Sequence, residues 1–260
     1  MKKLFIIPLL SAAVSLSLVS CLEMGKGGNK EEGSLLAVVG YSTKVMAPTM
    51  LTIAGEFAAP SLASENLYRG DCIWAHFTLD WDNQPNSEPP YYATEISYVT
   101  IDQSEAEIPT NFDEKELYIP AENILPIQSL AIQSYNPILN GKVFFGFSHN
   151  APTKQDMGYT LFVKPNENAS SDPITVYIIG EKKNKPEGAS STIETIYAFD
   201  MLGAIATLGE ETTIRENSVE YRVKQMKIKI KYCTGVDSNN APTYQDYNSG
   251  NTITLSIYTN

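Results

Sequence analysis

The stretch VKQMKIKIKY, residues 223–232, alternates strictly between apolar and polar side chains over its second half. Met226, Ile228, Ile230 and Tyr232 stand at every second position, with a lysine between each pair. Side chains of a β-strand point to opposite faces in turn, so this period of two predicts a strand with one buried face. A helix would scatter the same apolar residues around its circumference. This part of the chain therefore has to lie in a sheet that is covered on one side.

Four strand-like runs also lie between residues 34 and 104. The clearest is CIWAHFTLDW at 72–81, in which every second side chain from Ile73 to Trp81 is apolar. Weaker runs lie at 35–41, 49–54 and 91–101, and turn-forming residues separate the runs. Short antiparallel strands over roughly 70 residues suit a small barrel of the OB type. We therefore expect an OB-like β-barrel domain at 34–104.

The rest of the chain predicts a second β unit. Strand-like runs lie at 127–133, 142–148, 159–164, 174–179, 192–199, 223–232 and 252–258. Apolar residues at helical spacing in DMLGAIATLG, residues 200–209, predict one short helix among them. We expect an all-β fold in which a β-sandwich domain at 124–260 follows the barrel. The acidic segment 105–123, with prolines at 109 and 120, is interpreted as the linker.

The first residues have the composition of a secretory signal. Two lysines are followed by an uncharged run from Leu4 to Val19. This run is shorter than the roughly 20 residues that a membrane-spanning helix needs. The sequence Leu18-Val19-Ser20-Cys21 resembles a bacterial lipobox, which implies removal of the signal peptide 1–20 and lipidation of Cys21. Residues 21–33, rich in glycine, then form a lipidated tether. The alternative is an ordinary signal cleaved near Ser20, with Cys21 a free thiol.

Leu22 bears on which membrane holds the protein. An aspartate directly after the lipidated cysteine would resemble an inner-membrane retention signal, so Leu22 favours the bacterial outer membrane. Whether the protein faces the periplasm or the cell surface is not fixed by these residues.

Charge and cysteine content exclude several classes of protein. Loss of residues 1–20 removes Lys2 and Lys3 and no acidic residue, so the formal charge changes from −11 to −13. Nucleic-acid binding needs clustered basic residues, so no nucleic acid is expected as a partner. Cys72 and Cys233 lie about 160 residues apart in different predicted domains, which favours two buried thiols over a disulfide. No Cys/His cluster suggests a zinc site, and we expect no metal.

The order of these features along the chain resembles that of a known family. The chain resembles the NigD-like lipoproteins of Bacteroidetes in three features. These are a lipidated N-terminus, a short β domain that holds LYRGDCIWAHFTL and a tyrosine-rich strand, and the sequence AFDML before strands in which lysines alternate with apolar residues. That resemblance implies an N-terminal OB-like domain and a C-terminal β-sandwich. It implies no catalytic activity and supplies no site residues.

Candidate chemistry is sparse. The chain has two histidines, His76 in a predicted strand and His149 in a predicted turn, and neither accompanies a nucleophile motif. A structural role is expected for both, with no catalytic residues and no cofactor. The oxygen-rich stretch LDWDNQPNSE at 79–88 resembles the start of a calcium loop but lacks its later glycine and glutamate spacing, so a solvated loop is favoured.

Four aromatic residues bracket one predicted hairpin: Trp74, Trp81, Tyr91 and Tyr92. Aromatic rings that stack on sugar faces, with nearby Asp and Asn side chains, could form a glycan-binding platform. The competing interpretation is that Trp81 continues the apolar face and the tyrosines are cross-strand partners.

These observations predict a non-enzymatic, lipid-anchored protein of the cell envelope with a binding or structural role. One alternative is a glycan-binding accessory lipoprotein of a polysaccharide uptake system, which an exposed aromatic patch would favour. A second is a fimbrial or surface-assembly subunit, which a groove lacking one strand would favour.

Overall fold

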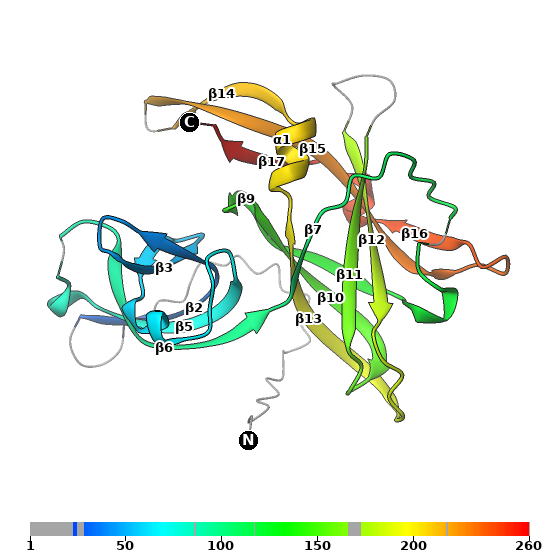
Figure 1. Cartoon of the computed structure of the whole chain (residues 1–260), viewed down its shortest axis with the longest axis horizontal. Helices are drawn as coiled ribbons and strands as arrows, with labels where there is room; N and C mark the ends of the chain where they lie inside the picture. The colour runs from blue at the N-terminus through cyan, green and yellow to red at the C-terminus, as the bar shows by residue number, and fades with distance from the viewer. Residues whose placement is uncertain are drawn as a thin grey trace.

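A computed structural model describes residues 23–24, 29–85, 87–116, 118–165, 173–216 and 218–259. The predicted signal peptide 1–20 and Cys21 lie outside these residues, as does most of the tether before Asn29. The described chain consists mostly of strands, which form a barrel and a sandwich that lie side by side (Figure 1). The predicted all-β fold is confirmed.

The barrel is closed by pairing of its first and fourth long strands. Its strands are β1 (Glu23–Met24), β2 (Lys30–Ser42), β3 (Ala47–Thr52), β4 (Gly55–Ala58), β5 (Cys72–Asp80) and β6 (Tyr91–Ile101). The order is β1-β2-β3-β4-β6-β5, and β5 also pairs with β2. β4 and β6 are parallel, and the 3-10 helix η1 (Pro60–Ser64) lies between β4 and β5 in the chain. The five strands β2, β3, β4, β6 and β5 form the closed ring of an OB barrel, and β1 pairs with β2 beside it.

The alternation predicted for 72–81 sets the barrel core. Ile73, Ala75, Phe77 and Leu79 are each at most 2% exposed and pack together in the interior. The pattern ends at Trp81, which begins the short 3-10 helix η2 (Trp81–Asn83) and is 36% exposed. Trp81 therefore does not continue the apolar face as predicted, because the chain leaves the strand at Asp80.

The sandwich consists of two sheets that share one core. The first contains β7 (Gln103–Glu105), β9 (Ser129–Leu139), β10 (Lys142–Pro152) and β13 (Ser190–Asp200), in the order β7-β13-β10-β9. The second contains β8 (Ile124–Leu125), β11 (Met157–Lys164), β12 (Ile174–Lys182), β14 (Glu210–Glu216), β15 (Val219–Val236), β16 (Pro242–Asp246) and β17 (Ile253–Tyr258). Short 3-10 helices η3 (Ala121–Asn123) and η4 (Tyr247–Gly250) precede β8 and β17.

The long strand β15 organises the second sheet, because it pairs with β12, β14, β16 and β17. Met226, Ile228, Ile230 and Tyr232 point into the shared core, and Lys227 and Lys229 are exposed. The predicted alternation is confirmed. The predicted helix is α1 (Leu202–Leu208), which turns Ala204 and Ile205 into the same core.

Strand β10 is buried on both faces. Its sequence VFFGF, from Val143, has no polar residue to place in water, and Phe144 and Phe145 are 0% and 1% exposed. Phe145 packs in the shared core of the sandwich. Phe144 points the other way, toward the barrel, because successive side chains of a strand face opposite sides.

An apolar cluster between the barrel and the sandwich contains Phe144. Its buried members are Val38, Cys72 and Ile101 from the barrel with Leu139, Phe144 and Ala198 from the sandwich. Leu36, Leu51, Trp74 and Ile196 pack around it. We call these ten residues the joint cluster. Beside this cluster the chain passes from the barrel to the sandwich, and Asp102 is the single residue between β6 and β7. The Asp102 carbonyl accepts a hydrogen bond from the Ala198 N–H.

The segment 105–123 lies against the sandwich. Glu107 exchanges backbone hydrogen bonds with Leu161 and Val163 on β11. Phe112 stacks on Tyr118, with ring centroids 5.2 Å apart, and lies 4.7 Å from the Tyr177 ring. The acidic residues and prolines predicted a linker here, but the aromatic residues between them cover the second sheet. We retain the division into domains at 34–104 and 124–260 as a proposal, with 105–123 packed on the second.

Candidate functional site

The four predicted aromatic site residues do not form one patch. Trp74 belongs to the joint cluster near the start of β5, while Trp81 follows the end of the same strand. Trp81 contacts Tyr91 edge to face, with ring centroids 5.0 Å apart and the planes at 75°. Tyr92 is partly buried, and its N–H donates to Gln84 Oε1 over 2.7 Å. The structure thus brings Trp81 and Tyr91 together and places Trp74 at the other end of the barrel.

The acidic groups next to Trp81 are already bound within the protein. Asp80 accepts hydrogen bonds from Asn83 Nδ2 at 3.0 Å and from the Asp82 N–H at 3.2 Å, and it pairs with Lys30 Nζ at 3.2 Å. The bond from Asn83 and the nearby charge of Lys30 hold the pKa of Asp80 below its usual value. Asp82 Oδ1 accepts from Asn29 Nδ2 over 3.0 Å.

These contacts bear on the calcium interpretation of 79–88. Asp80 and Asp82 already accept hydrogen bonds from the protein, which leaves fewer of their lone pairs for a cation. Within the described ranges, no three His, Cys, Asp or Glu side chains are grouped so as to hold a metal ion.

The chain enters the barrel beside Trp81. The Asn29 carbonyl accepts a hydrogen bond from the Trp81 N–H over 2.8 Å, and Lys30 opens β2 opposite Asp80. The β2–β3 loop meets the same region, where Lys44 Nζ donates to the Pro89 carbonyl over 2.8 Å. Met46, in that loop, is 72% exposed. We call Asn29, Lys30 and the segments 43–46 and 80–90 the tether end of the barrel.

His149 is fully buried in the sandwich. Its Nδ1 lies 2.8 Å from the Pro126 carbonyl, which can only accept, so Nδ1 carries the proton. The neutral ring then accepts at Nε2 from the Tyr159 hydroxyl over 2.7 Å. Burial lowers the pKa of His149 below its usual value of 6.5, and the bond to Pro126 opposes that shift in part. His149 is therefore a neutral hydrogen-bonding bridge in the core.

His76 has a partner that sequence reasoning missed. Its Nδ1 lies 2.9 Å from Ser34 Oγ, because Ser34 and His76 are opposite each other in the β2–β5 ladder. The 42-residue separation of the two residues carries no sequence signal for this contact. Both side chains are exposed on the outer face of the barrel, where no enclosing wall excludes water. The pair is a cross-strand contact of the kind that stabilises sheets.

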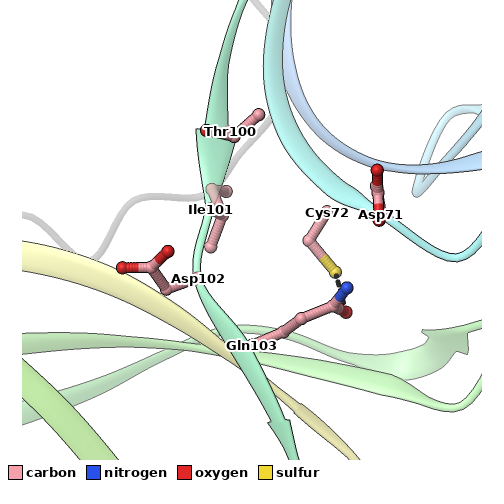
Figure 2. Close-up of a pocket in the computed structure, with 6 residues that line it drawn as sticks. All are labelled: Asp71, Cys72, Thr100, Ile101, Asp102 and Gln103. Carbon is pink, nitrogen blue, oxygen red and sulfur yellow. Dashed lines mark hydrogen bonds between the residues drawn. The ribbon is translucent and has the colours of Figure 1, made fainter. Parts of the chain in front are cut away.

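Both cysteines of the described chain are buried and unpaired, as predicted. Cys72 donates to Gln103 Oε1 over 3.2 Å at the edge of a cavity of about 300 Å³. Figure 2 shows Cys72 directed at the Gln103 side chain, with Asp71 beside it, Thr100 and Ile101 at the end of β6, and Asp102 directly after them. Burial raises the pKa of the Cys72 thiol to about 12. The thiol is therefore protonated at neutral pH and is a poor nucleophile.

The barrel is also the part of the chain that comparison with known proteins identifies. Residues 27–105 match the family model of the lipoprotein OB domain. The lipoprotein OB domain confirms the N-terminal OB-like domain implied by the resemblance to NigD-like lipoproteins. It indicates association with a membrane of the cell envelope. No curated protein matches the chain. Across the described part of the chain, no helix has the length and hydropathy needed to span a bilayer.

Two solved structures from Bacteroides species are similar to this chain. A protein of unknown function from Bacteroides vulgatus has 13% identity and a TM-score of 0.48, over 83% of this chain and 90% of that one. A NigD-like immunity protein from Bacteroides caccae has 7% identity and a TM-score of 0.46, over 88% of this chain and 98% of that one. At these values, neither decides the role of this protein.

Proposed function

We propose that the protein is a non-enzymatic lipoprotein of the bacterial outer membrane, anchored through Cys21, with a binding or structural role. The supporting observation is the place of the lipoprotein OB domain, which begins at residue 27, directly after the lipobox-like Leu18–Cys21. Strand β1 (Glu23–Met24), two residues after Cys21, pairs with β2 at Glu31 and Glu32, so the proposed anchor lies close to the barrel.

The described chemistry supports a role without catalysis. The two groups best suited to acid–base or nucleophilic work, His149 and Cys72, are held neutral by burial. The exposed pair Ser34–His76 lies on an open sheet face. The cavity beside Cys72 is lined by two carboxylates, a hydroxyl and an amide, and the Cys72 thiol in it is protonated at neutral pH.

The glycan-binding alternative is less well supported than sequence alone indicated. Trp81 and Tyr91 meet edge to face and do not form one flat platform. Asp80 and Asp82, which would have to accept hydrogen bonds from sugar hydroxyls, are engaged by Asn83, Lys30 and Asn29. The surface-assembly alternative needs a groove that lacks one strand, and the barrel does not provide one, because β2 and β5 close it.

Replacement of Cys21 with Ser tests the anchor. We expect the variant to leave the membrane fraction, since the acyl chains on that thiol supply the hydrophobic attachment. A density gradient of cell membranes, washed with high salt, measures the distribution between outer membrane, inner membrane and soluble protein. The matched control is Cys72→Ser, which leaves the lipobox intact and should stay with the outer membrane. Retention of Cys21→Ser on washed membranes would refute the proposal.

A further inference from the structure

Strand β5 connects two functionally different ends of the barrel. It begins at Cys72 in the joint cluster and ends at Asp80 in the tether end. Its nine residues extend over about 26 Å at the usual strand rise. The sandwich and the entry point of the chain are therefore held at opposite ends of the barrel.

The length of chain before Asn29 limits how far the tether end can be from the anchor. Cys21 precedes Asn29 by eight residues, and Gly25, Gly27 and Gly28 lie between them. Eight residues reach at most about 28 Å when extended. Strand β1 shortens this reach further, because Glu23, two residues after Cys21, pairs with Glu32 on β2. The Asn29 carbonyl in turn accepts a hydrogen bond from the Trp81 N–H.

The side chains at the tether end suit the interface of a bilayer. Trp81 is 36% exposed against Tyr91, and Met46 is 72% exposed on the adjoining loop. Tryptophan and tyrosine concentrate at membrane interfaces, where one end of the ring is apolar and the other is wet. The segments of the tether end carry two lysines against three acidic residues, so the argument for this end rests on its aromatic and apolar side chains and its nearness to Cys21, and not on its charge.

We propose that the tether end of the barrel rests on the bilayer surface, with Trp81 in the interfacial layer, and that the sandwich points away from the membrane. This inference depends on the proposed lipid anchor at Cys21. The joint cluster fixes the sandwich to the far end of the barrel, so the whole second sheet and its loops face the solution.

Fluorescence quenching tests the contact, because the chain has only two tryptophans, Trp74 and Trp81. The lipidated full-length protein is reconstituted into phosphatidylcholine vesicles with or without bromine on the upper acyl chain. Interfacial side chains reach about 5–10 Å into the headgroup and acyl boundary, so we expect bromine to quench the wild-type fluorescence clearly more than that of Trp81→Phe. Trp81→Phe leaves Trp74 as the reporter and should show almost no quenching. Since Trp81 is exposed and outside the barrel core, this variant should fold normally.

The outcomes separate this inference from the proposed function. If the wild-type protein floats with the vesicles but bromine quenches it no more than Trp81→Phe, the orientation is refuted and the anchor stands. If the protein does not float with vesicles at all, the anchor and the orientation both fail. If soluble Cys21→Ser protein responds to added oligosaccharide through Trp81 while vesicles have no effect, Trp81 serves glycan binding and the inference is overturned.

Discussion

The joint cluster makes a specific prediction about neighbouring phenylalanines of β10. Phe144 and Phe145 are both at most 1% exposed, yet Phe144 packs against the barrel and Phe145 against the opposite sheet. Replacing either with Ala removes a fully buried ring and leaves a cavity, which should lower the free energy of unfolding by about 3–5 kcal/mol. The two losses should be similar in size but different in location.

Trp74 distinguishes the two variants, because it packs on the same cluster as Phe144. In a Trp81→Phe background, Trp74 is the only tryptophan. We expect Phe144→Ala to shift the native emission of Trp74 to longer wavelength, since water gains access to the joint. Phe145→Ala should leave that emission unchanged. Urea melts followed by fluorescence and by circular dichroism give both quantities. A loss below about 1 kcal/mol for Phe144→Ala, with unmoved Trp74 emission, would refute the joint.

Three further outcomes follow from the packing. Ile228→Ala should cost about 2–5 kcal/mol and Lys229→Ala at most about 0.5 kcal/mol, and equal losses in denaturant melts would contradict the half-buried strand. Because burial lowers the pKa of His149, the unfolded chain takes up its proton first, so stability present above pH 6.5 should fall as the pH drops below it. Urea midpoints between pH 7.5 and 5 measure this, and His149→Gln should flatten the curve. A chain truncated to 102–260 should melt more cooperatively than one truncated to 124–260, because the shorter chain lacks Phe112, which packs on Tyr177. Identical calorimetric transitions of the two chains would contradict a stabilising role of this contact.

Local patterns were sufficient where one face of a strand is buried. The alternation in VKQMKIKIKY predicted β15 correctly because burial of one face and exposure of the other leave a period-two pattern in the sequence. The barrel strand at 72–81 was predicted for the same reason, up to Asp80. Trp81 was misplaced because alternation gives no information about where the backbone leaves the sheet.

Strands without a buried face left no such pattern. β14 has the sequence EETTIRE and is mostly exposed, so it is specified by pairing with β15 and not by its own hydrophobicity. β16, PTYQD, begins with a proline and is equally polar. The joint cluster was also beyond the sequence, since Trp74 and Phe144 lie 70 positions apart and only the fold brings them together. The contacts of Trp81 with Asn29 and Tyr91 could not be predicted from the sequence for the same reason, because the fold brings these residues together.

The closed ladder of the barrel also determines how the molecule bears a load. The tether enters at Lys30 and the sandwich leaves from Ile101, at opposite ends of the neighbouring strands β2, β5 and β6. A pull between the proposed anchor at Cys21 and the sandwich would run parallel to these strands. Their hydrogen bonds lie across the direction of pull, so the nine residue pairs between β2 and β5 are strained in shear, all at once. A ladder strained in this way breaks only when its pairs yield together, whereas a ladder opened from one end loses them one at a time.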